Sequence, residues 1–153
     1  MGNIQFTENG ILFTANGIAM DPDCCCVPCF RTCTDWHDKP QPDAIVSVSG
    51  ECSATCPDAA GTYSDAYHYS LCGVVWNPSS EMRLTVFYEE DPNRWLVYIY
   101  DSSYGVNIFE GYLPCSAITC DPETGRLNGT FDIPGVNYLF DCSGCTATIT
   151  LGP

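Results

Sequence analysis

Seven short runs rich in Val, Ile, Tyr, Phe and Thr recur from Ala44 onward, and no other feature of the sequence limits the fold as strongly. Each run is bounded by Gly, Pro, Asn or Asp, which favour turns and interrupt regular elements. No window shows the sustained 3.6-residue periodicity of an amphipathic helix. The predicted strands are Ala44 to Ser49, Leu71 to Trp76, Met82 to Tyr88, Trp95 to Tyr100, Val106 to Tyr112, Arg126 to Ile133 and Ala147 to Leu151.

Alternation within two of these runs predicts how their faces are buried. In the last run, Ala147, Ile149 and Leu151 share one face and threonines occupy the other, as in a strand with one wet face. The run Trp95 to Tyr100 is apolar on both faces, which predicts a strand covered on each side. We therefore expect residues 44–153 to form an all-β, antiparallel β-sandwich, jelly-roll-like or immunoglobulin-like.

Residues 1–20 contain an internal repeat, in which Phe-Thr-x-Asn-Gly-Ile begins at Phe6 and again at Phe13. Asn-Gly favours two-residue hairpin turns, so the repeat predicts a β-meander arm with Phe6 opposite Phe13 and Phe13 opposite Met20. An isolated ribbon is marginally stable, so its apolar face must cover either the core of this chain or another subunit. The predicted interface residues are Ile4, Phe6, Ile11, Phe13, Ile18 and Met20.

Twelve cysteines in 153 residues indicate crosslinks, and residues 21–43 form a cysteine- and proline-rich linker between arm and sandwich. Disulfides are the first interpretation, with Cys52 and Cys56, and Cys115 and Cys120, as local pairs, although spacing does not fix connectivity. Zinc is the second, because two Cys-x-x-Cys pairs have the spacing of zinc knuckles: Cys26 with Cys29 and Cys142 with Cys145. The predicted disulfide cysteines are Cys24, Cys25, Cys26, Cys29, Cys33, Cys52, Cys56, Cys72, Cys115, Cys120, Cys142 and Cys145.

Charge limits the partners of the chain. Its net charge is −14, with five Lys and Arg against nineteen Asp and Glu, so phosphate backbones are repelled and we expect no nucleic-acid partner. No stretch approaches the roughly 20 apolar residues of a membrane-spanning helix, so we expect no membrane insertion. A signal peptide is not visible in residues 1–10, whereas the cysteine content predicts an oxidising location outside the cell. A cleaved leader, oxidation after release from a lysed cell, or zinc in place of disulfides would each reconcile these two observations.

Candidate catalytic residues are limited to His37 and His68, and neither lies in a recognisable catalytic motif. We therefore expect no enzymatic activity and no cofactor. Aromatic residues in loops offer stacking surfaces for a glycan or a surface receptor. The predicted ligand loops contain Trp36, His37 and Tyr104.

Four segments together resemble a loose group of small uncharacterised bacterial and phage-associated proteins. The segments are Cys24-Cys25-Cys26, Pro42-Asp43-Ala44 through Ser49-Gly50, Cys52 through Gly61-Thr62-Tyr63, and Gly129-Thr130-Phe131. They span about residues 11 to 151 and specify a scaffold rather than an activity. The resemblance implies an accessory component of a virion or a cell surface, and no catalytic residue is carried over.

These features together predict a structural subunit of a phage virion, such as a tail, fibre or capsid-decorating protein, or of an extracellular filament. Its partners would be copies of itself or other assembly subunits, joined through β-mediated contacts and stabilised by disulfides. The alternative is an extracellular module that binds a glycan or a receptor through aromatic loops.

Overall fold

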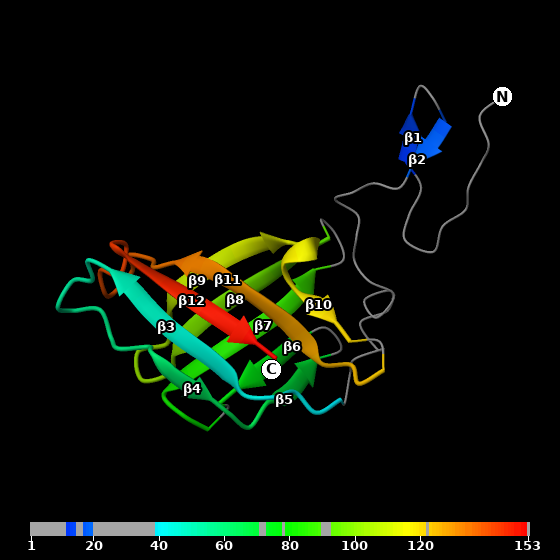
Figure 1. The fold of residues 1–153 in the computed structure, drawn as a ribbon. Helices are drawn as coiled ribbons and strands as arrows, with labels where there is room; N and C mark the ends of the chain where they lie inside the picture. Colours follow the sequence, from blue (N-terminus) through cyan, green and yellow to red (C-terminus); the bar gives the residue numbers. More distant parts are fainter. Residues whose placement is uncertain are drawn as a thin grey trace.

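Two antiparallel sheets form the fold (Figure 1). The structure, a computed structural model, describes residues 12–14, 17–19, 39–70, 73–77, 79–89, 93–121 and 123–152. One sheet has the strand order β10-β11-β12-β3-β4 and the other β5-β6-β7-β8-β9, so the predicted β-sandwich is confirmed. The strands are β3 (Ala44–Gly50), β4 (Gly61–Tyr63), β5 (Tyr67–Ser70), β6 (Gly73–Trp76), β7 (Met82–Glu89), β8 (Arg94–Asp101), β9 (Val106–Pro114), β10 (Thr119–Cys120), β11 (Leu127–Pro134) and β12 (Cys145–Leu151).

The two sheets differ in how their strands pair. Every strand of the second sheet pairs with its neighbour in sequence, whereas in the first sheet β12 returns to pair with β3, which is distant in sequence. The sandwich therefore combines local and long-range strand pairing.

Each of the seven predicted runs corresponds to a strand, with described ends that differ by at most two residues, whereas Leu71 and Cys72 lie outside the described residues. Sequence patterns missed β4, β5 and β10, because elements of two to four residues are too short to show alternation. Between Pro114 and Thr119, a single 3-10 turn, η2 (Cys115–Ala117), carries the chain from one sheet to the other. No helix in the described ranges is long and apolar enough to span a membrane.

The core lies between the inner faces of the two sheets. In β12 the residues Ala147, Ile149 and Leu151 are buried and the threonines between them are partly exposed, as predicted. The facing sheet contributes Trp76 and Trp95, whose indole N–H groups donate to backbone carbonyls. Both large side chains are thus buried without leaving a polar atom unsatisfied. The other buried core residues include Val46, Val74, Leu84, Val86, Val97, Ile99, Phe109, Phe131 and Ile133.

The end of the predicted linker packs on the sandwich. Gln41 bridges to the turn before β11: its Nε2 donates to the Gly125 carbonyl at 3.0 Å, and its Oε1 accepts from Leu127 N at 2.9 Å. Nε2 of His68 donates to the Lys39 carbonyl at 2.9 Å. The chain thus joins the sandwich several residues before β3, and His68 has a structural contact.

The arm contains a hairpin whose register differs from the prediction. β1 (Leu12–Thr14) and β2 (Gly17–Ala19) form a sheet of their own, with Phe13 opposite Ile18. The predicted turn at Asn16-Gly17 and the pairing of Phe13 with Met20 are therefore wrong, because strand pairing overrides the local preference of Asn-Gly. The partner of Phe13 has thus moved by two residues along the chain. The interface residues Ile4, Phe6, Ile11 and Met20 lie outside the described residues.

Tyr63, at the end of β4, gives the fold a predicted sensitivity to alkali. It is buried, and its hydroxyl donates to the Ala59 carbonyl at 2.9 Å. Burial, followed by the nearby carboxylate of Asp58, raises the pKa of Tyr63 from 10.0 to about 12. Because the unfolded chain ionises at the lower pKa, the stability contributed by protonated Tyr63 is complete below pH 10 and is lost as the pH rises to about 12.

Tyr63→Phe tests this linkage. Loss of the hydroxyl should cost about 1 kcal/mol at neutral pH, because the Ala59 carbonyl loses its donor. Above pH 10, however, the variant should lose less stability than the parent protein, as measured by urea denaturation at a series of pH values. Equal losses in both proteins across this range would show that another group causes the alkaline transition.

Candidate functional site

The two outer faces of the sandwich differ in chemistry. The first sheet presents hydroxyl-bearing side chains, including Thr146, Thr148 and Thr150, and Thr148 donates to the carboxylate of Asp132 at 2.6 Å. Ile45 is the large hydrophobic side chain exposed on this side. The second sheet presents aromatic side chains instead. This asymmetry makes the outer face of the second sheet the candidate interaction surface.

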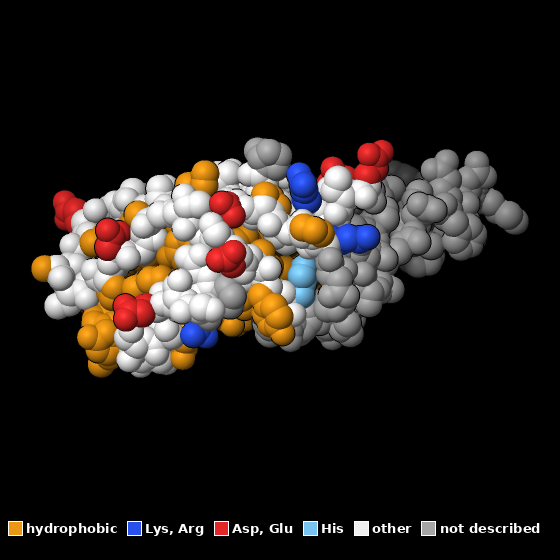
Figure 2. Space-filling view, turned by 90° about the horizontal axis from the view of Figure 1, so that it is seen from below, with side chains coloured by type: hydrophobic (Ala, Val, Ile, Leu, Met, Phe, Trp, Pro, Cys, Tyr) orange, Lys and Arg blue, Asp and Glu red, His pale blue; other side chains and the backbone are white. Residues whose placement is uncertain are grey.

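Cross-strand registers give the composition of this second surface, which we call the aromatic face. Three rows cross β7, β8 and β9: Phe87, Leu96 and Tyr112; Thr85, Tyr98 and Glu110; and Arg83, Tyr100 and Asn107. Val75 extends the middle row onto β6, and Tyr67 lies beside Val75 on β5. Figure 2 shows hydrophobic side chains that reach the surface of the domain between scattered charged groups.

The strand Trp95 to Tyr100 was predicted to be covered on both faces, but the structure covers only its inner face. Trp95, Val97 and Ile99 are buried in the core, whereas the alternate residues Leu96 and Tyr98 stay partly exposed. Apolar residues on both faces of a strand are typical of a buried strand, but they also occur where the outer face binds something.

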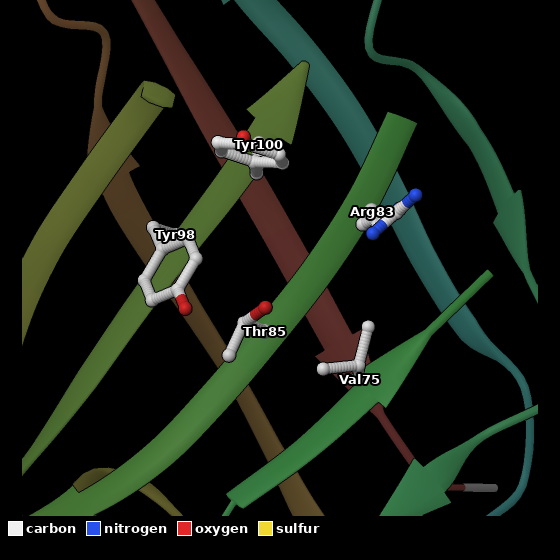
Figure 3. A pocket seen from close by; sticks show the side chains of 5 residues that line it. All are labelled: Val75, Arg83, Thr85, Tyr98 and Tyr100. Carbon is white, nitrogen blue, oxygen red and sulfur yellow. The ribbon is translucent and has the colours of Figure 1, made fainter. Parts of the chain in front are cut away.

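A pocket of about 220 Å³ opens on the aromatic face (Figure 3). Thr85 is its floor, because this small side chain lies between the larger Val75 and Tyr98 and is only 3% exposed. Arg83 and Tyr100 complete the lining. All five side chains project from β6, β7 and β8 on the side away from the other sheet (Figure 3).

Charges on the aromatic face are balanced, although the chain as a whole is strongly acidic. Arg94 forms an ion pair with Glu89 at 2.6 Å and stacks over the ring of Tyr112, 3.7 Å from its centroid. Arg83 is the second cation, and Glu110, which accepts from Asn107, is the second anion. Two cations and two anions leave this part of the surface without the repulsion expected from a net charge of −14.

A second exposed apolar surface lies at one end of the sandwich and consists of Tyr104, Tyr138, Leu139 and Phe140. We call it the loop tip. Tyr104 comes from the turn between β8 and β9, and its ring meets Phe140 edge-on at 4.8 Å between centroids. Tyr138, Leu139 and Tyr104 are 67%, 61% and 59% exposed, so the tip projects into solvent.

Backbone hydrogen bonds fix the shape of the tip. Asn137 and Asp141 form an antiparallel bridge, which presents the three residues between them as a tight turn. Cys142 N donates to the Val136 carbonyl at 3.2 Å, and Asp141 accepts from both the hydroxyl and the backbone N–H of Ser143. The two hydrogen bonds from Ser143 lower the pKa of Asp141, and the bond from the hydroxyl has the larger effect. The carboxylate of Asp141 therefore stays charged at neutral pH.

Two disulfides attach the base of the tip to the loop after β3. Cys56 is bonded to Cys142 and Cys52 to Cys145, with Cα–Cα distances of 5.1 and 5.0 Å. The predicted local pair of Cys52 with Cys56 is therefore wrong, because the strand pairing of β3 with β12 brings distant cysteines together.

The other cysteine predictions have mixed outcomes. Cys115 is disulfide-bonded, whereas the buried Cys120 carries a thiol that contacts the Asp121 carbonyl, so the predicted pair of Cys115 with Cys120 is also wrong. Two of the four predicted zinc ligands, Cys142 and Cys145, form disulfides instead, so they do not bind zinc in this structure. The remaining cysteines, Cys24, Cys25, Cys26, Cys29, Cys33 and Cys72, lie outside the described residues.

Of the predicted ligand residues, the structure places only Tyr104, which lies in the loop tip. Trp36 and His37 lie outside the described residues. Sequence reasoning missed the other tip residues and the pocket. The signal for the tip was three consecutive large apolar residues, Tyr138, Leu139 and Phe140, between the turn formers Asn137 and Asp141.

Comparison of the chain with protein-family models, with curated proteins and with solved structures finds no match. The resemblance to small phage-associated and bacterial proteins therefore stays a prediction.

Proposed function

We propose that the chain is a structural subunit of an assembly outside the cell, in a phage virion or an extracellular filament. The observation that carries the proposal is the aromatic face, an apolar and charge-balanced surface on a chain whose net charge is −14. Copies of so acidic a chain repel one another, so they associate most easily where this repulsion is smallest. The disulfides, which are typical of oxidising compartments, support a location outside the cell.

The size of the aromatic face is sufficient for an interface. Five strands at about 4.8 Å spacing, with up to nine residues at about 3.4 Å each, give roughly 500 Å² per partner after allowance for the short strands. Two partners would then bury about 1,000 Å², which is near the lower limit for a specific contact. Contacts by the arm, which remain a prediction, would add to this area.

Leu96→Asp tests the proposal directly. The parent protein should form oligomers that increase with protein concentration and with salt, because salt screens the repulsion between acidic copies. Leu96→Asp, which places a carboxylate between Phe87 and Tyr112 on the aromatic face, should remain monomeric at concentrations where the parent protein assembles. Sedimentation velocity and electron microscopy provide the measurement.

Ile45→Asp is the matched control, since Ile45 is 56% exposed on the outer face of the other sheet. It should assemble as the parent protein does. A parent protein that stays monomeric at every concentration and salt, or equal assembly by Leu96→Asp, would contradict the proposal.

A second candidate function is recognition of a glycan or a receptor by the loops, as the sequence alternative proposed. It is favoured by the exposed and rigid loop tip, in which Tyr104 contacts Phe140. A glycan array probed with monomeric Leu96→Asp would identify such binding.

A further inference from the structure

The pocket on the aromatic face contains a cation without an acidic partner. Within the described part of the chain, Arg83 donates from Nε to the Ser80 carbonyl at 3.2 Å, and no carboxylate there lies within 4.0 Å of it. This is notable in a chain with nineteen acidic residues and five basic ones. The guanidinium retains donors for an acceptor that is supplied from outside.

The other walls of the pocket are apolar or aromatic. Val75, Tyr98 and Tyr100 surround the floor, and the aliphatic stem of Arg83 adds to them. The volume of about 220 Å³ is below the roughly 300 to 1,000 Å³ that is typical of sites for drug-sized ligands. The pocket is therefore suited to one large side chain with an anionic group beside it.

The loop tip of the same chain carries this combination. Leu139 is 61% exposed at the turn, and Asp141 follows two residues later with a carboxylate held by Ser143. The turn is fixed at its base by the Cys56–Cys142 disulfide, so little conformational entropy is lost when it is bound. The exposed apolar side chain and the negative charge of the tip thus complement the apolar walls and the cation of the pocket.

We infer that the loop tip of one copy inserts Leu139 into the pocket of the next copy, with Asp141 facing Arg83. This inference rests on the proposed assembly function and names the partner of the aromatic face as a second copy of the chain. The tip lies at the end of the sandwich and the pocket opens on the face of a sheet, so the contact joins two different surfaces. Such heterologous contacts produce rings or open filaments.

Two variants, each defective in one of the two surfaces, test the inference in the full-length chain. Leu139→Asp disrupts the apolar contact of the loop tip and leaves the pocket intact. Arg83→Glu reverses the charge in the pocket and leaves the loop tip intact. Each should associate at least about thirtyfold more weakly than the parent protein, as for a central interface residue. An equimolar mixture should nevertheless form a 1:1 heterodimer that grows no further, because one intact tip meets one intact pocket.

Native mass spectrometry of variants with different isotope labels resolves the outcomes. Thermal melts establish folding, and Arg83→Gln replaces Arg83→Glu if the latter does not fold. Asp141→Asn, which keeps the acceptor for Ser143 and removes the charge, should weaken assembly several-fold.

Four outcomes overturn the inference. If the parent protein assembles but the mixture stays monomeric, or if either variant assembles normally, the contact uses other surfaces and the assembly function still stands. If a glycan array identifies a sugar that the parent protein binds and Arg83→Glu does not, the occupant of the pocket is a glycan. A parent protein that never assembles contradicts the proposed function itself.

Discussion

Replacing Cys52 and Cys56 by Ser is expected to lower the free energy of unfolding by about 6 to 7 kcal/mol, because both disulfides are lost. The two disulfides close loops with sequence separations of 93 and 86 residues, so the unfolded chain gains much freedom when both are absent. A loss of this size is a large part of the roughly 5 to 15 kcal/mol that stabilises a domain. Urea denaturation of the double variant beside the parent protein provides the measurement.

Single-disulfide variants serve as the controls. When Cys52–Cys145 remains, the second bond closes only the small ring through Cys56 and Cys142, so its removal should cost about 2 kcal/mol. Loss of the Cys56–Cys142 bond also releases the base of the loop tip. We therefore expect this variant to associate more weakly than the parent protein even under conditions where it stays folded. If reduction verified by mass left the urea midpoint unchanged, the disulfides would not stabilise the fold.

Phe109→Ala is expected to cost about 3 to 5 kcal/mol, because it removes a fully buried aromatic side chain where the two sheets meet. Phe109 lies in β9 and forms an antiparallel bridge with Gly135, which follows β11. Beside it, Val136 N donates to the Ile108 carbonyl at 3.0 Å. The variant should therefore also increase the hydrogen exchange of the Val136 amide.

Tyr112→Ala is the control on the same strand. Tyr112 is 52% exposed and faces outward, so its truncation should cost less than about 1 kcal/mol. Chemical denaturation monitored by circular dichroism distinguishes the two variants. A similar small loss for Phe109→Ala would mean that the contact between β9 and the end of β11 contributes little.

The long strands were predictable because alternation of apolar and polar residues is a local signal. The run of Ala147, Ile149 and Leu151 fixed both the strand and its buried face. The disulfide partners were not predictable, because Cys52 meets Cys145 only after β3 has paired with β12. The spacing of the cysteines along the chain does not indicate which strands will pair.

The candidate site was predictable only in part. The aromatic content of the run Trp95 to Tyr100 was visible, but the sequence did not indicate that Leu96, Tyr98 and Tyr100 would face outward. The pocket depends on the register that aligns Val75, Thr85 and Tyr98 across three strands. Such alignment is a property of the folded sheet and leaves no pattern within any single strand.

The pairing of β12 with β3 determines when the domain can fold during synthesis. Residues 145–151 lie between β3 and β11 in the middle of their sheet, about a hundred residues after the strand with which they pair. A nascent chain that stops before them has two open sheet edges and unpaired cysteines. Folding must therefore await the last strand, and the high contact order predicts that it is slow. During that interval the cell would have to protect the growing chain from aggregation and premature oxidation.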